Sequence, residues 1–299
     1  MKTLLQGRVI ATHGRHCFVE LEDGRTIKCF PRGKRSDVAV GDRVTVQAQG
    51  QDEGSIEKIE PRRNLLFRSD DFRSKQFAAN IDQLLIVVAP EPEFSDDLLG
   101  RALTAAWASD IRPFIVLNKI DLTAHLERAR QKLQPFVKLN VDILELSALD
   151  IAHSVSLLQP KLAGNTTLLL GQSGMGKSTL LNALVPEAQA HTQEYSQALR
   201  AGRHTTTSTR LYHLPSQDGT LIDSPGFQAF GLSHLELEDI IRGFPEFHEP
   251  IKSCRFYNCT HRHEPGCGVQ HALQTGAIDA QRFSLYERLL SEHEQKTHY

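Results

Sequence analysis

The segment GQSGMGKST, residues 171–179, has the spacing of glycine, lysine and hydroxyl side chains that defines a phosphate-binding loop. Glycines allow the backbone to wrap a phosphate group, and the N-terminus of a following helix adds positive potential. Lys177 is suited to contact the β- and γ-phosphates, and Ser178 to bind Mg²⁺. The alternative is a glycine-rich turn without a nucleotide. We predict nucleotide contacts from Gly171, Gln172, Ser173, Gly174, Met175, Gly176, Lys177, Ser178 and Thr179.

A second phosphate-site motif, Asp223-Ser224-Pro225-Gly226, follows the short apolar run TLI, where a strand would end. The carboxylate of Asp223 can hold the Mg²⁺ shell, directly or through water, and the backbone N–H of Gly226 can approach a γ-phosphate. At its spacing from the phosphate loop, this motif predicts that Lys177, Asp223 and Gly226 belong to one catalytic site.

Between these motifs lies the hydroxyl-rich segment AGRHTTTSTR, residues 201–210. Thr205, Thr206 and Thr207 each offer a hydroxyl group to Mg²⁺, as switch loops do when a γ-phosphate is bound. We favour Thr206, which makes Ser178, Thr206 and Asp223 the predicted Mg²⁺ ligands. A threonine-rich surface loop without this role is the alternative.

The tetrapeptide Asn118-Lys119-Ile120-Asp121 has the residue types that read guanine. Asp121 can accept hydrogen bonds from the guanine N1–H and 2-amino groups, which adenine does not present in that arrangement. Asn118 is expected to tie this loop to the purine and to the phosphate loop, and the stem of Lys119 to pack on the base. Ser147-Ala148, after the next apolar run, would supply a backbone N–H to guanine O6. The set predicts GTP and disfavours an ATP-dependent kinase.

The residue after the Asp223–Gly226 motif bears on hydrolysis. Phe227 stands where many GTPases carry a glutamine that orients the attacking water. An apolar ring cannot orient water by hydrogen bonding, so we expect slow turnover by the isolated chain. Either a partner or another residue must position the water, and His204 is the local candidate. The alternative for His204 is a histidine exposed on a loop.

Near the C-terminal end, Cys254, Cys259 and Cys267 surround two histidines, His261 and His263. Three sulfurs and one imidazole make a four-coordinate site of the kind that structural Zn²⁺ prefers. An odd number of cysteines in a chain with no sign of secretion favours a metal over disulfides. The residues alone leave the fourth ligand open between the two histidines, and unrelated free thiols are the alternative.

The elements that carry these motifs fall into three segments. Residues 1–64 contain short alternating pieces separated by turns, which predict a small β-barrel with an OB-fold. The stretch that follows, to about residue 80, has mixed charge and no period, and we interpret it as a linker. From Ile81, apolar runs alternate with helical segments, which predicts an open parallel sheet covered by helices. Residues 233–299 are helical and rich in His and Cys.

The order of the motifs along the chain is unusual. The guanine reader and Ser147-Ala148 come first, followed by the phosphate loop, the threonines and the Asp223–Gly226 motif. Moving the first two to the end restores the ordinary order of a GTPase. Since such a site is built at strand ends in space, the change requires only that the old termini lie close together. The sequence therefore predicts a circularly permuted GTPase domain.

This order, with a β-barrel before it and a Cys/His cluster after it, resembles the ribosome-small-subunit-dependent GTPase family, RsgA/YjeQ. The segments GQSGMGKST and GRHTTT are similar to that family's forms. The resemblance implies a GTPase of late 30S subunit maturation, stimulated by the subunit and in contact with 16S rRNA. It also implies one structural Zn²⁺ per chain held by Cys254, Cys259, His261 and Cys267. The domains expected are 1–64, 65–232 and 233–299.

Composition narrows the class of protein. With 40% hydrophobic and 23% charged residues, the chain reads as an ordinary globular protein. No apolar run is long enough to predict a membrane span, and the first residues lack the apolar core of a secretory signal. We expect a cytoplasmic monomer that binds GTP and GDP. The rival hypotheses are a GTP-regulated assembly switch for a non-ribosomal target and a nucleic-acid-binding module with a vestigial nucleotide site.

Overall fold

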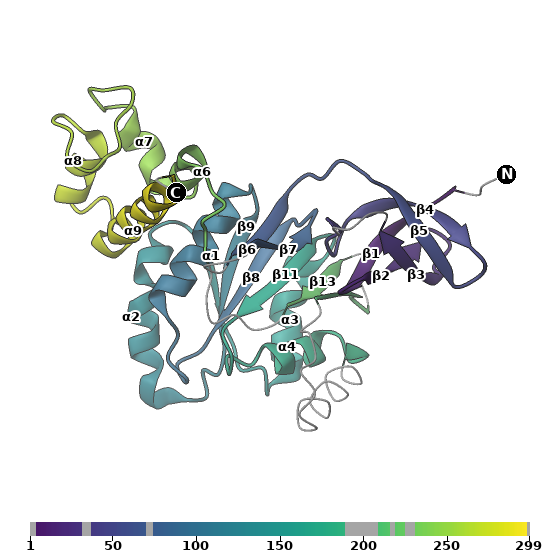
Figure 1. Cartoon of the computed structure of the whole chain (residues 1–299). Helices are drawn as coiled ribbons and strands as arrows, with labels where there is room; N and C mark the ends of the chain where they lie inside the picture. The colour runs from purple at the N-terminus through teal and green to yellow at the C-terminus, as the bar shows by residue number, and fades with distance from the viewer. Residues whose placement is uncertain are drawn as a thin grey trace.

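The computed structural model describes residues 4–31, 37–69, 74–188, 209–215, 219–224 and 231–297. Three bodies are visible in Figure 1: a β-barrel on the right, an α/β unit in the centre and a group of helices at the upper left. They follow one another along the chain, in agreement with the expected multidomain fold. The exact bounds of the three domains remain a prediction.

The N-terminal body is a closed five-stranded barrel. Its strands are β1 (Leu4–His13), β2 (His16–Leu21), β3 (Thr26–Pro31), β4 (Arg43–Gln49) and β5 (Glu53–Ile59). β1 pairs with β2 and β4, β2 pairs with β3, and β5 pairs with β3 and β4, which closes the barrel. Burial alternates along β2, as expected for a strand with one face in the core. The interior is filled by Val9, Cys17, Val19, Leu21, Ile27, Cys29, Val38, Val44, Val46 and Ile56.

The central body is an open sheet in the order β10-β9-β8-β11-β13-β12. Its strands are β8 (Gln83–Val88), β9 (Arg112–Leu117), β10 (Asp142–Glu145), β11 (Thr166–Gly171), β12 (Arg210–His213) and β13 (Thr220–Asp223). All neighbours are parallel except β12, which runs antiparallel to β13. Every residue of β8 and β11 is buried, because helices cover both faces.

Four helices cover this sheet. They are α1 (Asp96–Ala108), α2 (Leu126–Val137), α3 (Ile151–Leu162) and α4 (Lys177–Leu184), with a short 3₁₀ turn η1 (Thr123–His125) before α2. In Figure 1, α1 and α2 lie on one side of the sheet, and α3 and α4 pack together on the other. The predicted alternation of strands and helices is confirmed.

β12 joins the central sheet to the barrel, so that eleven strands form one continuous sheet. Its Arg210 pairs with Ala11 of β1. Next to this pairing, the Arg8 guanidinium donates hydrogen bonds to Thr166 Oγ1 at 2.9 Å and to Thr220 Oγ1 at 3.4 Å. The His213 imidazole also lies 2.8 Å from a carboxylate oxygen of Glu20. The barrel is therefore fixed to the central body by backbone and side-chain contacts.

The segment after the barrel is not a linker, which corrects our interpretation. It forms a hairpin of β6 (Leu65–Ser69) and β7 (Ser74–Ala79). The Asn64 side chain and the backbone of Ile81 exchange two hydrogen bonds, of 2.8 and 2.9 Å, which close the base of this hairpin. Phe77 and Ala78 are buried. The sequence did not indicate this short strand pair, because its charges are mixed and few of its residues are buried.

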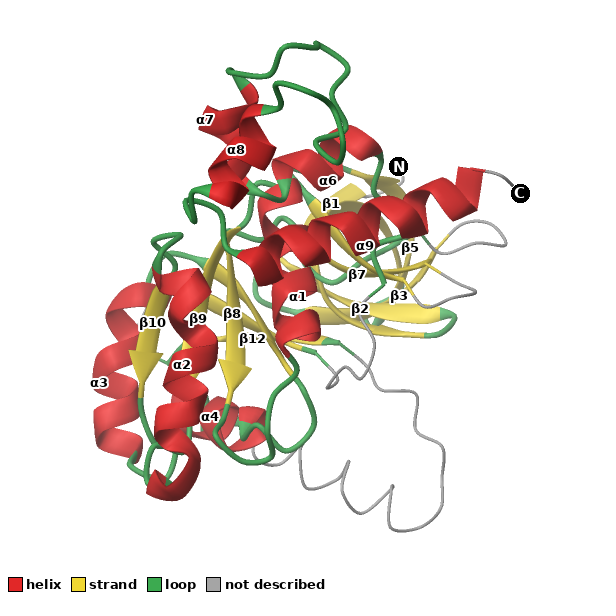
Figure 2. Ribbon diagram, turned by 90° about the vertical axis from the view of Figure 1, so that its left-hand side faces the viewer, coloured by secondary structure: helices red, strands yellow, loops and turns green. Residues whose placement is uncertain are grey.

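The C-terminal body contains α6 (Leu237–Arg242), the short turn η2 (Pro245–Phe247), α7 (His248–Ile251), α8 (Gly268–Gln274) and α9 (Ala280–Thr297). Figure 2 shows the long α9 crossing in front of α1. Arg101 of α1 pairs with Glu292 of α9 within hydrogen-bond distance, and Asp97 of α1 pairs with Arg288 at 2.7 Å. Among the described helices, none has the length and apolar character needed to cross a membrane.

Candidate nucleotide site and metal centre

The sequence motifs meet at the carboxyl edge of the central sheet. From β8 the chain builds outward through β9 to β10, and it then returns to add β11 and β13 on the other side of β8. The crevice between the two directions of winding is where open α/β sheets bind ligands. The phosphate loop follows β11, the tetrapeptide 118–121 follows β9, Ser147-Ala148 follows β10, and Asp223 ends β13.

The phosphate loop requires its glycines. Gly174 and Gly176 have φ angles of 81° and 88°, in the left-handed region that favours glycine. A Cβ atom on Gly176 would also lie 2.3 Å from Nδ2 of Asn118, which is far too close. Gly176 precedes the first residue of α4, Lys177, so the loop leads directly into a helix N-terminus. This is the backbone arrangement that the sequence predicted for phosphate binding.

Asn118 connects three of the motifs. Its side chain is 1% exposed, and its Nδ2 donates a hydrogen bond of 2.9 Å to the carbonyl oxygen of Met175 in the phosphate loop. Its Oδ1 accepts a hydrogen bond of 2.8 Å from the backbone N–H of Ala148. The guanine reader, the phosphate loop and the Ser147-Ala148 loop are therefore held together by one amide. This is the tie between loops that the sequence led us to expect.

The other residues around the expected base position are exposed or half-buried. Asp121 is exposed, and Ser147 and Ile120 are half-buried. Lys119 has a φ of 61°, and its ammonium group donates a hydrogen bond of 2.9 Å to the Glu91 carbonyl, which extends its stem along the site. Such an arrangement leaves the Asp121 carboxylate free to meet a ligand.

Lys177 and Asp223 interact electrostatically beside the phosphate loop. Burial lowers the pKa of Lys177, and the nearby carboxylate of Asp223 opposes the shift. Burial likewise raises the pKa of Asp223 to about 6, with Lys177 opposing. The hydroxyl of Ser178 is exposed on the first turn of α4. A carboxylate and a hydroxyl on neighbouring elements are the oxygen donors that Mg²⁺ prefers, so these residues fit the metal that accompanies GTP.

Some predicted site residues lie outside the described residues. These are His204, Thr205, Thr206, Thr207, Gly226 and Phe227. Ser224, the last described residue of its motif, is 2% exposed and donates a hydrogen bond of 2.8 Å to the Leu169 carbonyl of β11. This bond fixes the start of the Asp223–Gly226 motif against the strand that carries the phosphate loop.

Sequence reasoning gave Gln172 no role beyond the phosphate loop. In the structure its Oε1 accepts a hydrogen bond of 2.7 Å from the backbone N–H of Ser95, the N-cap residue of α1. A glutamine inside such a loop carries no signal of a partner so distant in sequence. The contact means that the phosphate loop and the start of α1 are positioned together.

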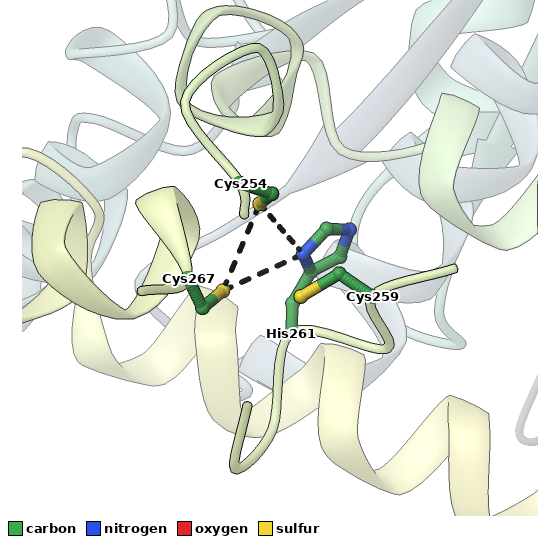
Figure 3. Close-up of side chains that lie close together, drawn as sticks. All are labelled: Cys254, Cys259, His261 and Cys267. Carbon is green, nitrogen blue, oxygen red and sulfur yellow. Dashed lines mark hydrogen bonds between the residues drawn. The ribbon is translucent and has the colours of Figure 1, made fainter. Parts of the chain in front are cut away.

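The Cys/His cluster forms in the C-terminal body, as Figure 3 shows. The ligand atoms of Cys254, Cys259, His261 and Cys267 all lie within 4.8 Å of one another. His261 Nδ1 is 3.6 Å from the sulfurs of Cys254 and Cys267, which are 3.9 Å apart. Tetrahedral Zn²⁺ with bonds of about 2.3 Å to sulfur and 2.0 Å to nitrogen requires separations of about 3.8 and 3.5 Å. The residues therefore fit zinc.

The geometry favours His261 over His263 as the fourth ligand. His261 is 3% exposed and turned into the cluster, whereas His263 is exposed. The Glu264 carboxylate shapes the intervening loop, because it accepts hydrogen bonds of 2.6 Å from the Thr260 N–H and of 3.0 Å from the Arg262 N–H. In the sequence, Glu264 gives no specific signal, since it is one acidic residue among histidines.

Together, the fold and the site define a circularly permuted phosphate-loop GTPase with an OB-fold barrel and a Cys/His-rich helical region. Residues 59–233 match the model of the RsgA GTPase family. The chain is 67% identical, over 287 residues, to the small ribosomal subunit biogenesis GTPase RsgA of Bordetella pertussis, with 96% of each chain covered. It belongs to the RsgA GTPase family and is a GTPase.

Other comparisons agree. The RsgA protein of Burkholderia pseudomallei is 58% identical over 295 residues, with 97% of this chain and 93% of that protein covered. The crystal structure of YjeQ from Thermotoga maritima matches with a TM-score of 0.74 and 29% identity, covering 97% of this chain and 99% of that one. YloQ, described as a circularly permuted GTPase, matches with a TM-score of 0.71 and 28% identity, covering 98% and 96%. The predicted permutation is confirmed.

Proposed function

We propose that this GTPase acts in late maturation of the small ribosomal subunit, that it binds 16S rRNA, and that the subunit stimulates its hydrolysis of GTP. The observation that carries the proposal is the extent of the likeness: 67% identity covers 96% of the chain, and therefore includes both bodies outside the GTPase domain. The relatives are named for biogenesis of this subunit. The proposal places the activity in the cytoplasm, with one monomer bound per subunit.

In the proposed site, Asp121 reads the guanine edge, and Asn118 fixes the loop that carries it. The backbone N–H groups of residues 172–178 surround the phosphates. Lys177 offsets the negative charge of the β- and γ-phosphates, between which the bond breaks in hydrolysis. Ser178 and Asp223 would hold Mg²⁺, with Thr206 as the proposed third protein ligand. When bound, Mg²⁺ would neutralise the charge that develops on the phosphate oxygens. These groups bind and polarise GTP without positioning the attacking water.

We propose that the partner completes the site by bringing a residue of this chain to the attacking water. Phe227 cannot hydrogen-bond to water, so the free chain should hydrolyse GTP slowly. The partner would hold Thr206 and His204 at the nucleotide, and His204 is the residue we propose to orient the water. Where a trans-acting group completes a GTPase site, the rate rises by about 10³–10⁵. We therefore expect the subunit to increase the rate of GTP hydrolysis by a large factor.

Zinc in the C-terminal body would have a structural role. Cys254, Cys259, His261 and Cys267 occupy all four positions of a tetrahedral site, which leaves none for a substrate or a water molecule. When bound, the metal contributes folding free energy to a segment with little secondary structure of its own. The proposed consequence is a rigid surface for the partner.

Sedimentation with purified 30S subunits tests the proposal. The chain should co-sediment with the subunits in the presence of a non-hydrolysable GTP analogue and not with GDP, and subunits should accelerate GTP hydrolysis. Isolated 50S subunits serve as the control and should do neither. Absence of both effects with 30S subunits would contradict the proposal. Guanine-nucleotide-dependent binding to another RNA alone would instead favour a switch for a non-ribosomal target.

A further inference from the structure

The outer surface of the barrel carries a row of rings that the GTPase site does not use. Side chains alternate between the two faces of a strand, so Cys17 and Cys29 fill the core while their neighbours point outward. These neighbours are His16 and Phe18 on β2 and Lys28 and Phe30 on β3. With His13 at the end of β1, they form what we call the barrel platform: His13, His16, Phe18, Lys28 and Phe30.

The rings of the barrel platform are in mutual contact. The rings of His13 and His16 stack with centroids 5.5 Å apart, and each meets the ring of Phe18 edge-on at 5.6 Å. The ring of Phe30 lies 6.3 Å from that of His16, and the Lys28 ammonium group lies 5.1 Å from its centroid. Phe30 is 39% exposed. A large ring therefore lies partly in solvent beside an aromatic neighbour and a cation.

Cationic groups lie within and beside the barrel platform. Lys28 lies within it, and Arg15 is exposed in the turn between β1 and β2. Arg210 of β12 lies beside β1, and its guanidinium is one of the groups that lower the pKa of His13, after burial and His16. The carboxylate of Glu20, on the same side of β2, is engaged by His213 at 2.8 Å. Glu53 of β5, which is exposed and pairs with Lys28 in the β3–β5 register, is a carboxylate beside Lys28, so an anionic ligand would be drawn to the side of Arg15 and Arg210.

We propose that the barrel platform stacks on unpaired bases of an RNA strand, with Lys28 and Arg210 facing its phosphates. Every base has a face that can stack on an aromatic ring, and cations beside the rings suit the connecting backbone. In duplex RNA these faces are already stacked on neighbouring bases. An apolar protein segment would offer no anionic group to the cations. This inference rests on the proposed function, since it specifies the kind of RNA that the barrel contacts.

Fluorescence anisotropy of a short labelled single-stranded RNA, titrated with the full chain, measures this binding. Phe30→Ala should weaken it about tenfold, the size expected for loss of one stacked base. Phe30→Trp should retain affinity, and its indole emission should be quenched as RNA binds, above the background of Trp107, the single tryptophan of the chain. The matched control is Leu4→Ala, because Leu4 is an apolar side chain of the same barrel that is 58% exposed.

Two further readouts make the test decisive. Lys28→Gln should reduce the slope of log affinity against log salt by about 1, as expected for one phosphate contact. Duplex RNA of the same length should bind more weakly than the single strand. Equal binding of single strand and duplex, or unchanged affinity of Phe30→Ala, would overturn the inference even if 30S subunits stimulate the wild-type chain. Phe30-dependent RNA binding without stimulation by subunits would support it and contradict the proposed function instead.

Discussion

Asn118 shows how much of the nucleotide site depends on one buried side chain. Its amide holds the Met175 carbonyl and the Ala148 N–H at 2.9 and 2.8 Å. Asn118→Asp keeps an acceptor for Ala148 but places a carboxylate oxygen opposite the Met175 carbonyl. An unpaired buried polar group costs about 1–3 kcal/mol. We therefore expect affinity for GDP to fall about 5- to 150-fold by titration calorimetry. Asn140→Asp, at an exposed position, is the control, and equal affinity of the Asn118 variant would contradict the bridging role.

Base recognition can be tested at Asp121, which is exposed and available to a ligand. Asp121→Asn replaces an acceptor with an amide that can donate, so it should weaken GTP and favour xanthosine nucleotides, whose C2 oxygen accepts. Hydrogen bonds to charged groups contribute about 1.5–3 kcal/mol, which corresponds to a loss of about 10- to 150-fold for GTP. Competition binding with GTP and XTP measures the exchange. The control is Asp142→Asn, which changes another exposed carboxylate and should leave both affinities unchanged. Unchanged GTP binding by Asp121→Asn would show that Asp121 does not contact the base.

Asp223 should give nucleotide binding a pH dependence. Burial raises its pKa to about 6, against about 3.9 in an unfolded chain. Because the folded pKa is the higher one, the ionised carboxylate destabilises the nucleotide-free fold above pH 6, and that penalty is relieved as pH falls from about 6 to about 4. Binding of Mg²⁺ with nucleotide requires the ionised form. Affinity for Mg²⁺-GDP should therefore fall, by up to about tenfold for each pH unit below 6.

Comparison with Asp223→Asn isolates this effect from protonation of the nucleotide itself. The variant should bind Mg²⁺-GDP more weakly at neutral pH and should show only the pH dependence that the nucleotide contributes. A wild-type profile that runs parallel to that of the variant between about pH 5 and 7 would mean that Asp223 does not titrate with binding.

At the scale of elements, the loop between α7 and α8 depends on its proposed metal. Cys259 is 9% exposed, and burial, the largest cause, raises the pKa of its thiol to about 12, so a thiolate there needs a cation. Cys259→Ser should lower zinc content from one per chain, measured by elemental analysis, and expose the C-terminal body to proteolysis. Cys17→Ser, which changes a buried cysteine of the barrel core, should keep the zinc. A metal-free wild-type chain with full thermal stability would contradict a structural zinc.

Long buried strands could be predicted from the sequence, whereas short strands and contacts between loops could not. The strands β8 and β11 contain the apolar runs LLIVV and LLL, and the motifs that follow them had to meet at one sheet edge. β12 was missed because it has only four residues, with Leu211 buried and His213 exposed, which is too short for a periodic signal. The hairpin of β6 and β7 was missed because its charged residues suggested a linker. The bond from Ser95 to Gln172 joins residues 77 positions apart and depends on how the loops pack.

On the scale of the whole molecule, the barrel is not an appended module. Residues 1–64 supply β1, which pairs with β12, and Arg8, which donates hydrogen bonds to Thr166 and Thr220 at the start of β11 and β13. Deleting them would expose the edge of β12 and leave both threonines without these bonds. We expect the truncated chain to lose stimulation by 30S subunits and also to melt earlier, by about 2–4 °C for each kcal/mol lost.

A single substitution in the barrel separates these two effects. Lys28 points outward from β3, so Lys28→Gln should leave the melting temperature and GTP affinity unchanged while weakening stimulation by 30S subunits. The loss should be larger at low salt, because phosphate contacts depend on the release of counterions. Lys58→Gln is the matched control, since Lys58 lies on β5 of the same barrel and is paired with Glu60. If the Lys28 variant and the truncated chain are both stimulated as strongly as the full chain, the barrel does not bring the subunit to the GTPase site.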